Sequence, residues 1–206
     1  GTPSDPSGNL DASQVARVAE QIGAVLARGG GEHLVVLRST VLPGTVEREV
    51  APRLEAAAGK RLGRGFDLCF HPEFLREGSA VRDFRQPPKI VIGAASPAAA
   101  EKLAGLYRDF TAPLIVTSIA AAEMVKYADN AFHALKVVFA NEIGALCKAL
   151  GIDSHEVMRI FCEDRKLNIP PYYLQPGFAY GGSCLPKDLR ALLHLSRRLE
   201  VHAPLL

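Results

Sequence analysis

The sequence lacks long apolar runs, clustered cysteines and an excess of charge of either sign. No uncharged apolar run approaches the ~18 residues of a spanning helix, so we expect neither a transmembrane segment nor a membrane partner. Lys and Arg number 24 and Asp and Glu 22, and this balance, without a basic stripe, argues against a nucleic-acid partner. With 48% apolar and 22% charged residues among 206, the composition is that of a soluble globular protein with one or two domains.

Other signatures are also missing. The cysteines contain no CxxC pair and follow no secretory leader, which favours a reduced, cytoplasmic compartment. Because the sequence contains no HxxxH and no Cys/His cluster, we expect no metal site. No GxGxxG follows a predicted strand, so the phosphate-binding turn of a dinucleotide fold is not expected in this chain. The chain has no initiating Met and stops on an apolar step, from which we expect a piece of a longer protein.

The first part of the chain alternates short apolar runs with helical patterns. The pattern predicts strands at residues 33–38, 66–70, 89–93 and 113–117, and helices at residues 11–28, 45–58 and 97–110. Ser96 followed by Pro97 is a typical helix start, with a capping side chain and then proline at the first helical position. This alternation predicts an α/β layer with a mostly parallel sheet.

After Ser118 the pattern becomes entirely helical. We expect one helix over residues 119–150, about 48 Å long at 1.5 Å per residue, which is too long for one small domain to surround. Two further helices are expected at residues 153–164, with Asp153 or Ser154 as the cap, and at residues 186–200. We place a domain boundary near Ser118, between an α/β part (1–118) and a helical part (119–206).

Polar residues share one side of the long helix. At 100° per residue, Lys126, Asn130, His133 and Asn141 fall within an arc of about 80°. One interpretation is a solvated stripe. The alternative is a polar cleft that positions a ligand, since one lysine, two amides and a histidine are hydrogen-bonding groups rather than the mixed charges of a wet face.

A glycine-rich loop precedes the last predicted helix. Gly181 and Gly182 allow a close backbone approach, and Pro186 marks the helix start, which places Cys184 just ahead of it. A thiolate there is favoured by the helix dipole and by Lys187. A lone cysteine is more often a small core residue, and we keep that interpretation for Cys69, Cys147 and Cys162.

Loops that follow predicted strands hold further candidates. Glu73 and Glu77 lie in the loop 71–78, directly after a strand, and Thr40 follows another strand. In parallel sheets the loops at the carboxyl ends of strands form the ligand crevice, where two carboxylates can act as a general base and an anchor for a hydroxyl or water. An ordinary charged loop is the alternative for 71–78.

Five stretches, RSTVLPGT (38–45), HPEFLREG (71–78), EMVKYADNAFHALKVVFANE (123–142), CEDRKLNIPPYY (162–173) and PGFAYGGSCLPKD (176–188), carry a family resemblance. The chain resembles the UDP-glucose/GDP-mannose dehydrogenase family, and most closely its GDP-mannose 6-dehydrogenase branch. The resemblance implies a partial Rossmann-like sheet followed by a helical domain with a long dimer-forming helix. It also implies NAD as cofactor, a nucleotide sugar as substrate, and four-electron oxidation of the sugar C6 alcohol to the uronic acid.

Roles follow from the resemblance residue by residue. Cys184 matches the nucleophile that forms a thiohemiacetal and then a thioester, Lys126 and Asn130 the oxyanion-stabilising pair, Asp188 a carboxylate acting through water, and Glu73 the base for thioester hydrolysis. Thr40 and Lys187 match cofactor contacts. The positions that match substrate contacts are Glu77, His133, Asn141, Tyr172, Tyr173, Phe178 and Gly181. Gln175 departs from the pattern, because a basic residue is expected there.

Two other functions remain open on the sequence. One is a two-electron hydroxyacid dehydrogenase that uses the Lys/Asn pair without a covalent step, and the other is a non-catalytic helical dimerisation module. In each case we expect a homodimer through the 119–150 helix, because apolar residues surround much of its circumference. Without the glycine turn, this chain alone is expected to be catalytically silent.

Overall fold

The computed structural model describes residues 2–164 and 182–198, which divide into two compact units. The first unit comprises residues 1–5 and 10–126, and the second residues 6–9 and 127–206. The helix α5 (Ile119–Leu150) begins in the first unit and continues into the second. The predicted helix over residues 119–150 is therefore confirmed along its whole length.

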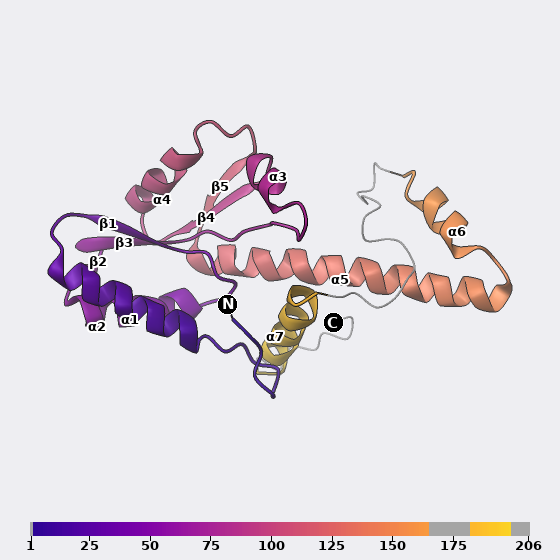
Figure 1. Cartoon of the computed structure of the whole chain (residues 1–206), viewed down its shortest axis with the longest axis horizontal. Coiled ribbons are helices and arrows are strands. Elements are labelled where there is room, and N and C mark those ends of the chain that lie inside the picture. Colours follow the sequence, from indigo (N-terminus) through magenta and orange to yellow (C-terminus); the bar gives the residue numbers. More distant parts are fainter. Residues whose placement is uncertain (1, 165–181, 199–206) are drawn as a thin grey trace. The chain divides into compact units, whose positions relative to one another are not determined.

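The first unit is an α/β layer. Its elements in chain order are α1 (Ser13–Arg28), β1 (His33–Leu37), the π-helical turn η1 (Val46–Val50), α2 (Ala51–Ala58), β2 (Arg61–Leu62), β3 (Gly65–Phe70), α3 (Ala80–Arg85), β4 (Ile90–Ala94), α4 (Pro97–Ala104), the 3₁₀ turn η2 (Gly105–Tyr107) and β5 (Leu114–Thr117). The sheet has the order β1-β3-β4-β5, with β2 beside β3. Figure 1 shows α1 and α2 on one face of this sheet and α4 on the other.

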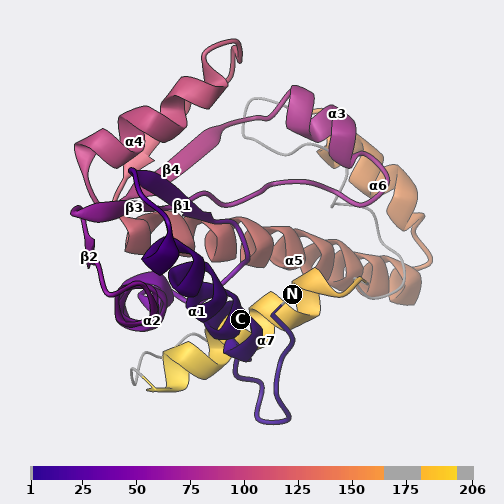
Figure 2. The same ribbon diagram turned by 60° about the vertical axis from the view of Figure 1, so that its left-hand side comes forward.

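The alternation of side chains along β3 explains why both faces are covered. Phe66, Leu68 and Phe70 pack into the core shared with α1, α2 and the start of α5, whereas Cys69 packs with Ile90, Ile92 and α4. Successive strand side chains point to opposite faces, so a nearly continuous apolar run indicates a sheet buried on both sides. The turned view in Figure 2 shows the same three layers.

The sheet is not parallel throughout. β1 pairs with β3 and β4 with β5 in parallel, whereas β3 and β4 are antiparallel through Cys69–Ala94 and Phe70–Gly93. A parallel pair needs a crossover that carries the chain back along the sheet, and the segment between β3 and β4 contains only the six-residue α3. The expectation of a mostly parallel sheet is met by the other two main pairs.

The helix ends follow from local chemistry. Ser96 caps α4, because its side chain accepts from the Ala99 N–H at 3.1 Å, as predicted. The predicted helix 45–58 instead begins as a π turn, in which the Ala51 N–H donates to the Val46 carbonyl. Pro52 explains the change, because its ring excludes a regular α-helical bond to the preceding turn.

The start of α5 packs closely against β4 at Gly93. A Cβ built on Gly93 of β4 would lie 2.7 Å from the Ala122 Cβ and 2.8 Å from the Ile119 Cα. Only glycine permits this approach. The first turns of α5 therefore lie next to the strands of the first unit. This position allows the Glu123 and Lys126 side chains to contact the loops that follow these strands.

The second unit consists of the rest of α5 with α6 (Ser154–Phe161) and α7 (Cys184–Arg198). Asp153 caps α6 by accepting from the His155 N–H at 2.9 Å, so one of the two predicted caps is confirmed. Met158 and Cys162 pack with Ala140 of α5 in a small buried cluster. The predicted helix 186–200 begins two residues early, because a proline is tolerated anywhere in a first turn, where N–H groups have no helical acceptor.

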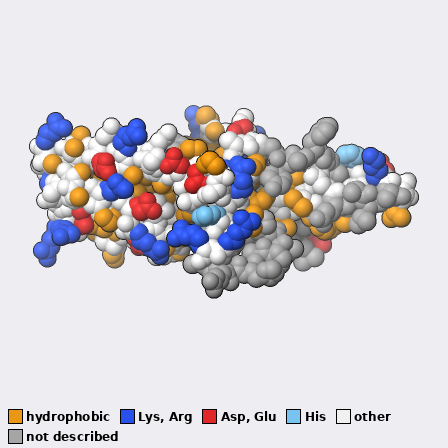
Figure 3. All heavy atoms as spheres, turned by 90° about the horizontal axis from the view of Figure 1, so that it is seen from below, with side chains coloured by type: hydrophobic (Ala, Val, Ile, Leu, Met, Phe, Trp, Pro, Cys, Tyr) orange, Lys and Arg blue, Asp and Glu red, His pale blue; other side chains and the backbone are white. Residues whose placement is uncertain are grey.

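The surface carries charges of both signs. Figure 3 shows Lys and Arg side chains interspersed with Asp and Glu over the described part of one face. Surface ion pairs include Arg53–Glu20 at 2.6 Å and the contacts of Lys102 with Glu32 and Asp67, both at 2.9 Å. None of the helices in the described ranges is long and apolar enough to cross a membrane.

Candidate active site

Two residues predicted to be catalytic form an ion pair in the first unit. The Lys126 Nζ donates to the backbone carbonyl of Glu73 at 2.7 Å and to its Oε1 at 3.0 Å. The Lys126 side chain is only 8% exposed, whereas the Glu73 side chain is 31% exposed. Glu73 Oε2 also accepts from the Leu75 N–H at 2.7 Å, so the carboxylate is fixed at both oxygens. Within the described part of the chain two of the three Lys126 N–H groups are used, which leaves one for a ligand oxygen.

An aromatic and a histidine support the Glu73 loop. The Lys126 Nζ lies 5.7 Å from the centre of the Phe74 ring, and the Lys89 Nζ lies 4.7 Å from it. His71 is buried and makes contacts of 2.7 Å through both ring nitrogens, Nδ1 with the Val91 carbonyl and Nε2 with the Tyr107 hydroxyl. A neutral ring that donates from Nδ1 and accepts at Nε2 satisfies both contacts. Burial lowers the pKa of His71, which keeps that form.

A buried acid orders the turn that carries Glu77. Asp83 accepts from the backbone N–H, Nε and Nη2 of Arg76 at 2.7–3.0 Å and from the Ser79 hydroxyl at 2.9 Å. The Arg76 guanidinium holds the pKa of Asp83 well below its usual range. Glu77 itself is exposed in this turn, next to the hydrogen-bonded residues. The structure therefore leaves Glu77 accessible to a ligand.

Thr40 lies half-exposed in the loop that follows β1. Its backbone carbonyl accepts from the Thr2 hydroxyl at 2.8 Å. Further along the same loop, the Gly44 and Val46 N–H groups donate to the Glu123 carboxylate at 2.6 and 2.9 Å. Glu123 is fully buried, and this burial raises its pKa, although the two N–H groups act in the opposite direction.

Cys184 and Asp188 lie one turn apart on α7 in the second unit. Cys184 is the first residue of the helix rather than the residue ahead of it, and it is exposed. Asp188 is only 2% exposed, and it accepts from the Asn130 amide of α5. The Lys187 Nζ lies 3.1 Å from the other carboxylate oxygen. The unit therefore brings Asn130 and Lys187 to Asp188, one helical turn after Cys184, and the catalytic roles expected for these residues stay predictions.

This arrangement suits nucleophilic chemistry at the thiol. Residues four apart on a helix are neighbours on one face, so the Asp188 carboxylate lies on the Cys184 side of α7. The other three cysteines are buried, and the prediction that they are core residues is confirmed.

The polar side of α5 is buried and the opposite side is exposed. Lys126 and Asn130 are buried and His133 and Asn141 half-buried, so a solvated stripe is the wrong interpretation of the arc. At 100° per residue, the exposed large apolar side chains lie on the opposite half of the helix: Met124, Phe132, Leu135, Val138 and Phe139. This is the reverse of the pattern of an ordinary surface helix.

The sequence analysis missed two buried charges on α5, Glu123 and Lys136. Lys136 is 7% exposed, with its Nζ 4.9 Å from the centre of the Phe132 ring, and burial lowers its pKa. Glu123 had a signal in the sequence, since it is the only acid among the first ten residues of a helix that is otherwise apolar there except for Lys126 and Tyr127. The predicted substrate residues Tyr172, Tyr173, Phe178 and Gly181, and the departure at Gln175, lie outside the described residues.

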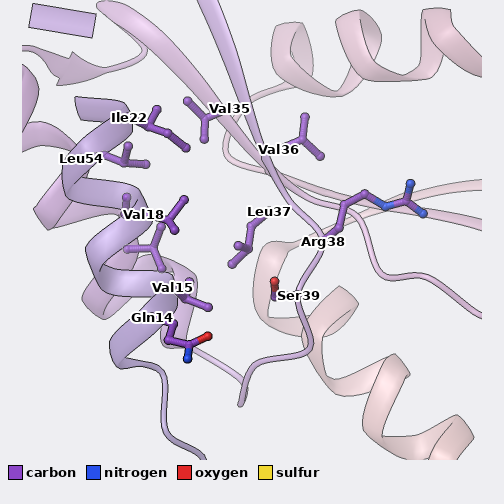
Figure 4. A pocket seen from close by; sticks show the side chains of 12 residues that line it. Gln14, Val15, Val18, Ile22, Val35, Val36, Leu37, Arg38, Ser39 and Leu54 are labelled. Atoms are coloured by element: carbon purple, nitrogen blue, oxygen red, sulfur yellow. The ribbon is translucent and has the colours of Figure 1, made fainter. Parts of the chain in front are cut away.

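A groove of about 260 Å³ lies away from these residues, along the edge of β1. Figure 4 shows Val15, Val18 and Ile22 of α1 facing Val35 and Leu37 of β1 across it. It contains none of the residues predicted to be catalytic. In the described part of the chain β1 pairs with β3 on one side only, so the groove adjoins an open strand edge.

Comparison with known proteins identifies the family to which this fold belongs. Residues 1–111 match the NAD binding domain of the UDP-glucose/GDP-mannose dehydrogenase family, and residues 120–206 match its central domain. GDP-mannose 6-dehydrogenases from Pseudomonas savastanoi pv. phaseolicola and Pseudomonas aeruginosa are 50% and 47% identical over all 206 residues, which cover 47% of each relative.

Solved structures agree with the sequence matches. A UDP-glucose dehydrogenase from Pyrobaculum islandicum is 43% identical with a TM-score of 0.92, over 98% of this chain and 45% of that one. A ternary complex of GDP-mannose dehydrogenase from Pseudomonas aeruginosa is 47% identical with a TM-score of 0.80, over 99% and 47%. The chain thus belongs to the UDP-glucose/GDP-mannose dehydrogenase family, and it spans about half the length of the relatives it matches.

Proposed function

We propose that this chain supplies the thiol-bearing half of an NAD-dependent nucleotide-sugar 6-dehydrogenase that converts GDP-mannose to GDP-mannuronate. The observation that carries the proposal is the exposed Cys184 on the first turn of α7, one turn before the Asp188 carboxylate that Asn130 holds. The higher identity to GDP-mannose 6-dehydrogenases, 47–50%, than to UDP-glucose 6-dehydrogenases, 42–43%, supports the choice of sugar.

Oxidation of an alcohol to an acid requires removal of two hydrides. The first oxidation converts the C6 alcohol to the aldehyde. The Cys184 thiolate then forms a C–S bond to the aldehyde carbon, and the carbonyl oxygen becomes the hydroxyl of a thiohemiacetal. Loss of a second hydride and the hydroxyl proton gives the thioester, and water then opens the C–S bond to release the acid and return the thiol.

The chain's own residues stabilise charge at these steps. Lys126 and Asn130 lie one turn apart on α5, and each supplies an N–H donor for the oxygen that becomes negative as the carbon changes geometry. Asp188 orients water through its carboxylate, and Glu73 accepts a proton from the water that opens the thioester. Lys126 must share its donors with Glu73, so the pair links oxyanion stabilisation to the base.

The residues present fit one part of an NAD site. NAD, when bound, accepts the hydride in each oxidation. The half-exposed Thr40 follows β1 at the carboxyl end of a parallel strand, where such folds hold dinucleotides, and Thr40 and Lys187 are the proposed contacts. The glycine turn that binds the pyrophosphate has no counterpart in the sequence. The groove beside β1 is the place where a further strand of a complete domain would pair.

The second part of the proposal is a homodimer. The exposed apolar side of α5 and the length of the helix exceed what a small helical unit covers, and a second copy with the same face is the natural partner. We include Glu77, His133, Asn141, Tyr172, Tyr173, Phe178 and Gly181 as proposed sugar-nucleotide contacts.

A chimera tests the reaction type. This chain replaces the aligned 206 residues of the Pseudomonas aeruginosa GDP-mannose 6-dehydrogenase, and NADH and sugar acid are counted in a reaction with limiting GDP-mannose. We expect two NADH for each uronic acid. One NADH for each sugar, with the aldehyde as product, would instead identify a two-electron enzyme, and a folded chimera without turnover would contradict the proposal altogether.

A further inference from the structure

Glu123 is a fully buried carboxylate with no place in the reaction described above. The two segments that it joins contribute Val41, Val46, Ile119 and Ala122 to the apolar core of the first unit. Burial of a carboxylate is unfavourable unless hydrogen bonds satisfy it. Both oxygens are satisfied by backbone donors 77 and 79 residues earlier in the chain, the N–H groups of Val46 and Gly44.

The two donors belong to the start of a helical segment that has no cap of its own. Thr45, the residue ahead of η1, makes no capping hydrogen bond through its side chain. The first N–H groups of a helix have no partner within it, and they are normally satisfied by a nearby side chain. Glu123 supplies this cap from a different helix, so the start of η1 is tied to α5.

The capped segment is the end of the loop that carries Thr40. The Thr2 hydroxyl fixes the loop at the Thr40 carbonyl at 2.8 Å, and Glu123 fixes it at Gly44 and Val46. Between these points the Thr45 N–H donates to the Leu42 carbonyl at 3.0 Å. Gly44 has φ +88°, a conformation that other residues adopt only with strain. The loop is therefore held in one shape from both ends.

Glu123 also lies three residues before Lys126, on the same part of α5. Lys126 holds the loop after β3 through Glu73, and Glu123 holds the loop after β1. β1 and β3 are parallel neighbours with Leu37 opposite Phe70. The two loops therefore begin side by side, at the carboxyl ends of these strands. One turn of helix thus sets the positions of both loops.

We propose that Glu123 is a positioning residue for the dinucleotide, which acts by fixing the loop of Thr40 relative to the turn of α5 that carries Lys126. The inference rests on the proposed function, since it takes Thr40 as a cofactor contact. A loop that is already ordered loses less entropy when the ligand binds, so release of the loop weakens NAD binding more than it slows the chemical steps.

The first test needs no cofactor. Glu123→Gln keeps the shape of the side chain but replaces one acceptor with an NH₂ group, which leaves the Gly44 or Val46 N–H unsatisfied. We expect hydrogen exchange of these two amides in the 206-residue chain to be at least about tenfold faster than in the unsubstituted chain, with the β4 amides unchanged. Unchanged exchange at Gly44 and Val46, or equal acceleration throughout the sheet, would overturn the inference.

Asp83→Asn is the matched control. Asp83 is also a buried carboxylate that accepts a backbone N–H, but it orders the Arg76–Ser79 turn. The Asp83→Asn substitution should leave hydrogen exchange of the Gly44 and Val46 amides unchanged. Thr2→Val, which removes the donor to Thr40 from the other end of the loop, is a second variant if Glu123→Gln does not fold.

The second test measures cofactor affinity in the chimera described above. Glu123→Gln is expected to raise the KM for NAD about fivefold or more, while kcat and the KM for the sugar nucleotide change less than about twofold. Asp83→Asn should not change the KM for NAD. A loss of kcat without a change in the KM for NAD would overturn the inference. A chimera that binds no NAD before any substitution would contradict the proposed function. Normal NAD binding in the Glu123→Gln chimera would contradict only the role proposed for Glu123.

Discussion

Lys126 holds Glu73 by two hydrogen bonds, one to its backbone carbonyl and one to its carboxylate. The contact joins residues 53 positions apart, from α5 and from the loop after β3. It makes the lysine a structural support for the loop and, in our proposal, also an electrostatic support for the reaction. The two roles can be separated, because a supporting contact affects stability whereas an oxyanion donor affects rates.

Substitution of Lys126 is expected to slow both oxidations. Each passes through a negatively charged oxygen, so Lys126→Ala should lower kcat by roughly 10²–10³ with either the alcohol or the aldehyde as substrate. The rates are followed as NADH formation by the chimera. Lys148→Ala, at an exposed lysine near the end of the same helix, is the control and should keep full activity. A rate loss confined to one of the two substrates would show that Lys126 serves a single step.

Buried His71 makes stability depend on pH. Burial lowers the pKa of His71 below the ordinary 6.5, so the unfolded chain takes up a proton more readily than the folded one. This contribution to stability is present above pH 6.5 and is lost as the pH falls toward the folded-state pKa. Urea unfolding at a series of pH values between about 7.5 and 5.5 should show a fall that is smaller in His71→Gln. The exposed His155→Gln serves as control, and an unchanged pH slope in His71→Gln would contradict this reading.

The chain by itself should bind NAD only weakly. The Thr40 loop is in place, but the sequence offers no glycine turn for the pyrophosphate. Calorimetric titration of the 206-residue chain should therefore show no binding at micromolar concentrations. Micromolar affinity would mean that other residues of this chain hold the phosphates.

We expect the proposed dimer to depend on the exposed apolar side of α5. Leu135 and Val138 are 37% and 38% exposed, and Leu135→Glu with Val138→Glu would place two charges in the proposed interface. Sedimentation equilibrium should give a dimer for the unsubstituted chain and a monomer for the double variant. Val25→Glu, at a 65% exposed valine on α1, should leave the dimer intact. An unsubstituted chain that is monomeric at micromolar concentrations would contradict the proposal.

The elements that sequence patterns predict well are those with a strong local signal. The main strands and the 32-residue α5 follow from apolar periodicity, and the caps at Ser96 and Asp153 from side-chain chemistry. Helix geometry also predicted that Lys126, Asn130, His133 and Asn141 share one side of α5, but it left open whether that side faces water or a ligand. The burial of Lys126 and Asn130 excludes the solvated stripe.

The features that escaped prediction depend on contacts distant in sequence. Glu123 stands out as the single acid at an apolar helix start, but its partners, the Gly44 and Val46 N–H groups, lie nearly 80 residues away and cannot be inferred from the sequence. The antiparallel pairing of β3 with β4 depends on the path of the chain between them, and α3 and β2 are too short for a periodic signal. The domain boundary near Ser118 stays a prediction, as do the assigned roles of the site residues.

The most direct test of the covalent mechanism uses Cys184→Ser in the chimera, with alcohol and aldehyde substrates assayed separately. Serine keeps the shape, but its hydroxyl is almost never ionised at neutral pH, so the C–O adduct forms poorly and no thioester can exist. We expect the first oxidation to survive at least in part, and acid formation from the aldehyde to fall by more than the ~10²–10⁴ assigned to a single acid–base group. Uronic acid formation from the aldehyde at nearly the unsubstituted rate would contradict the account.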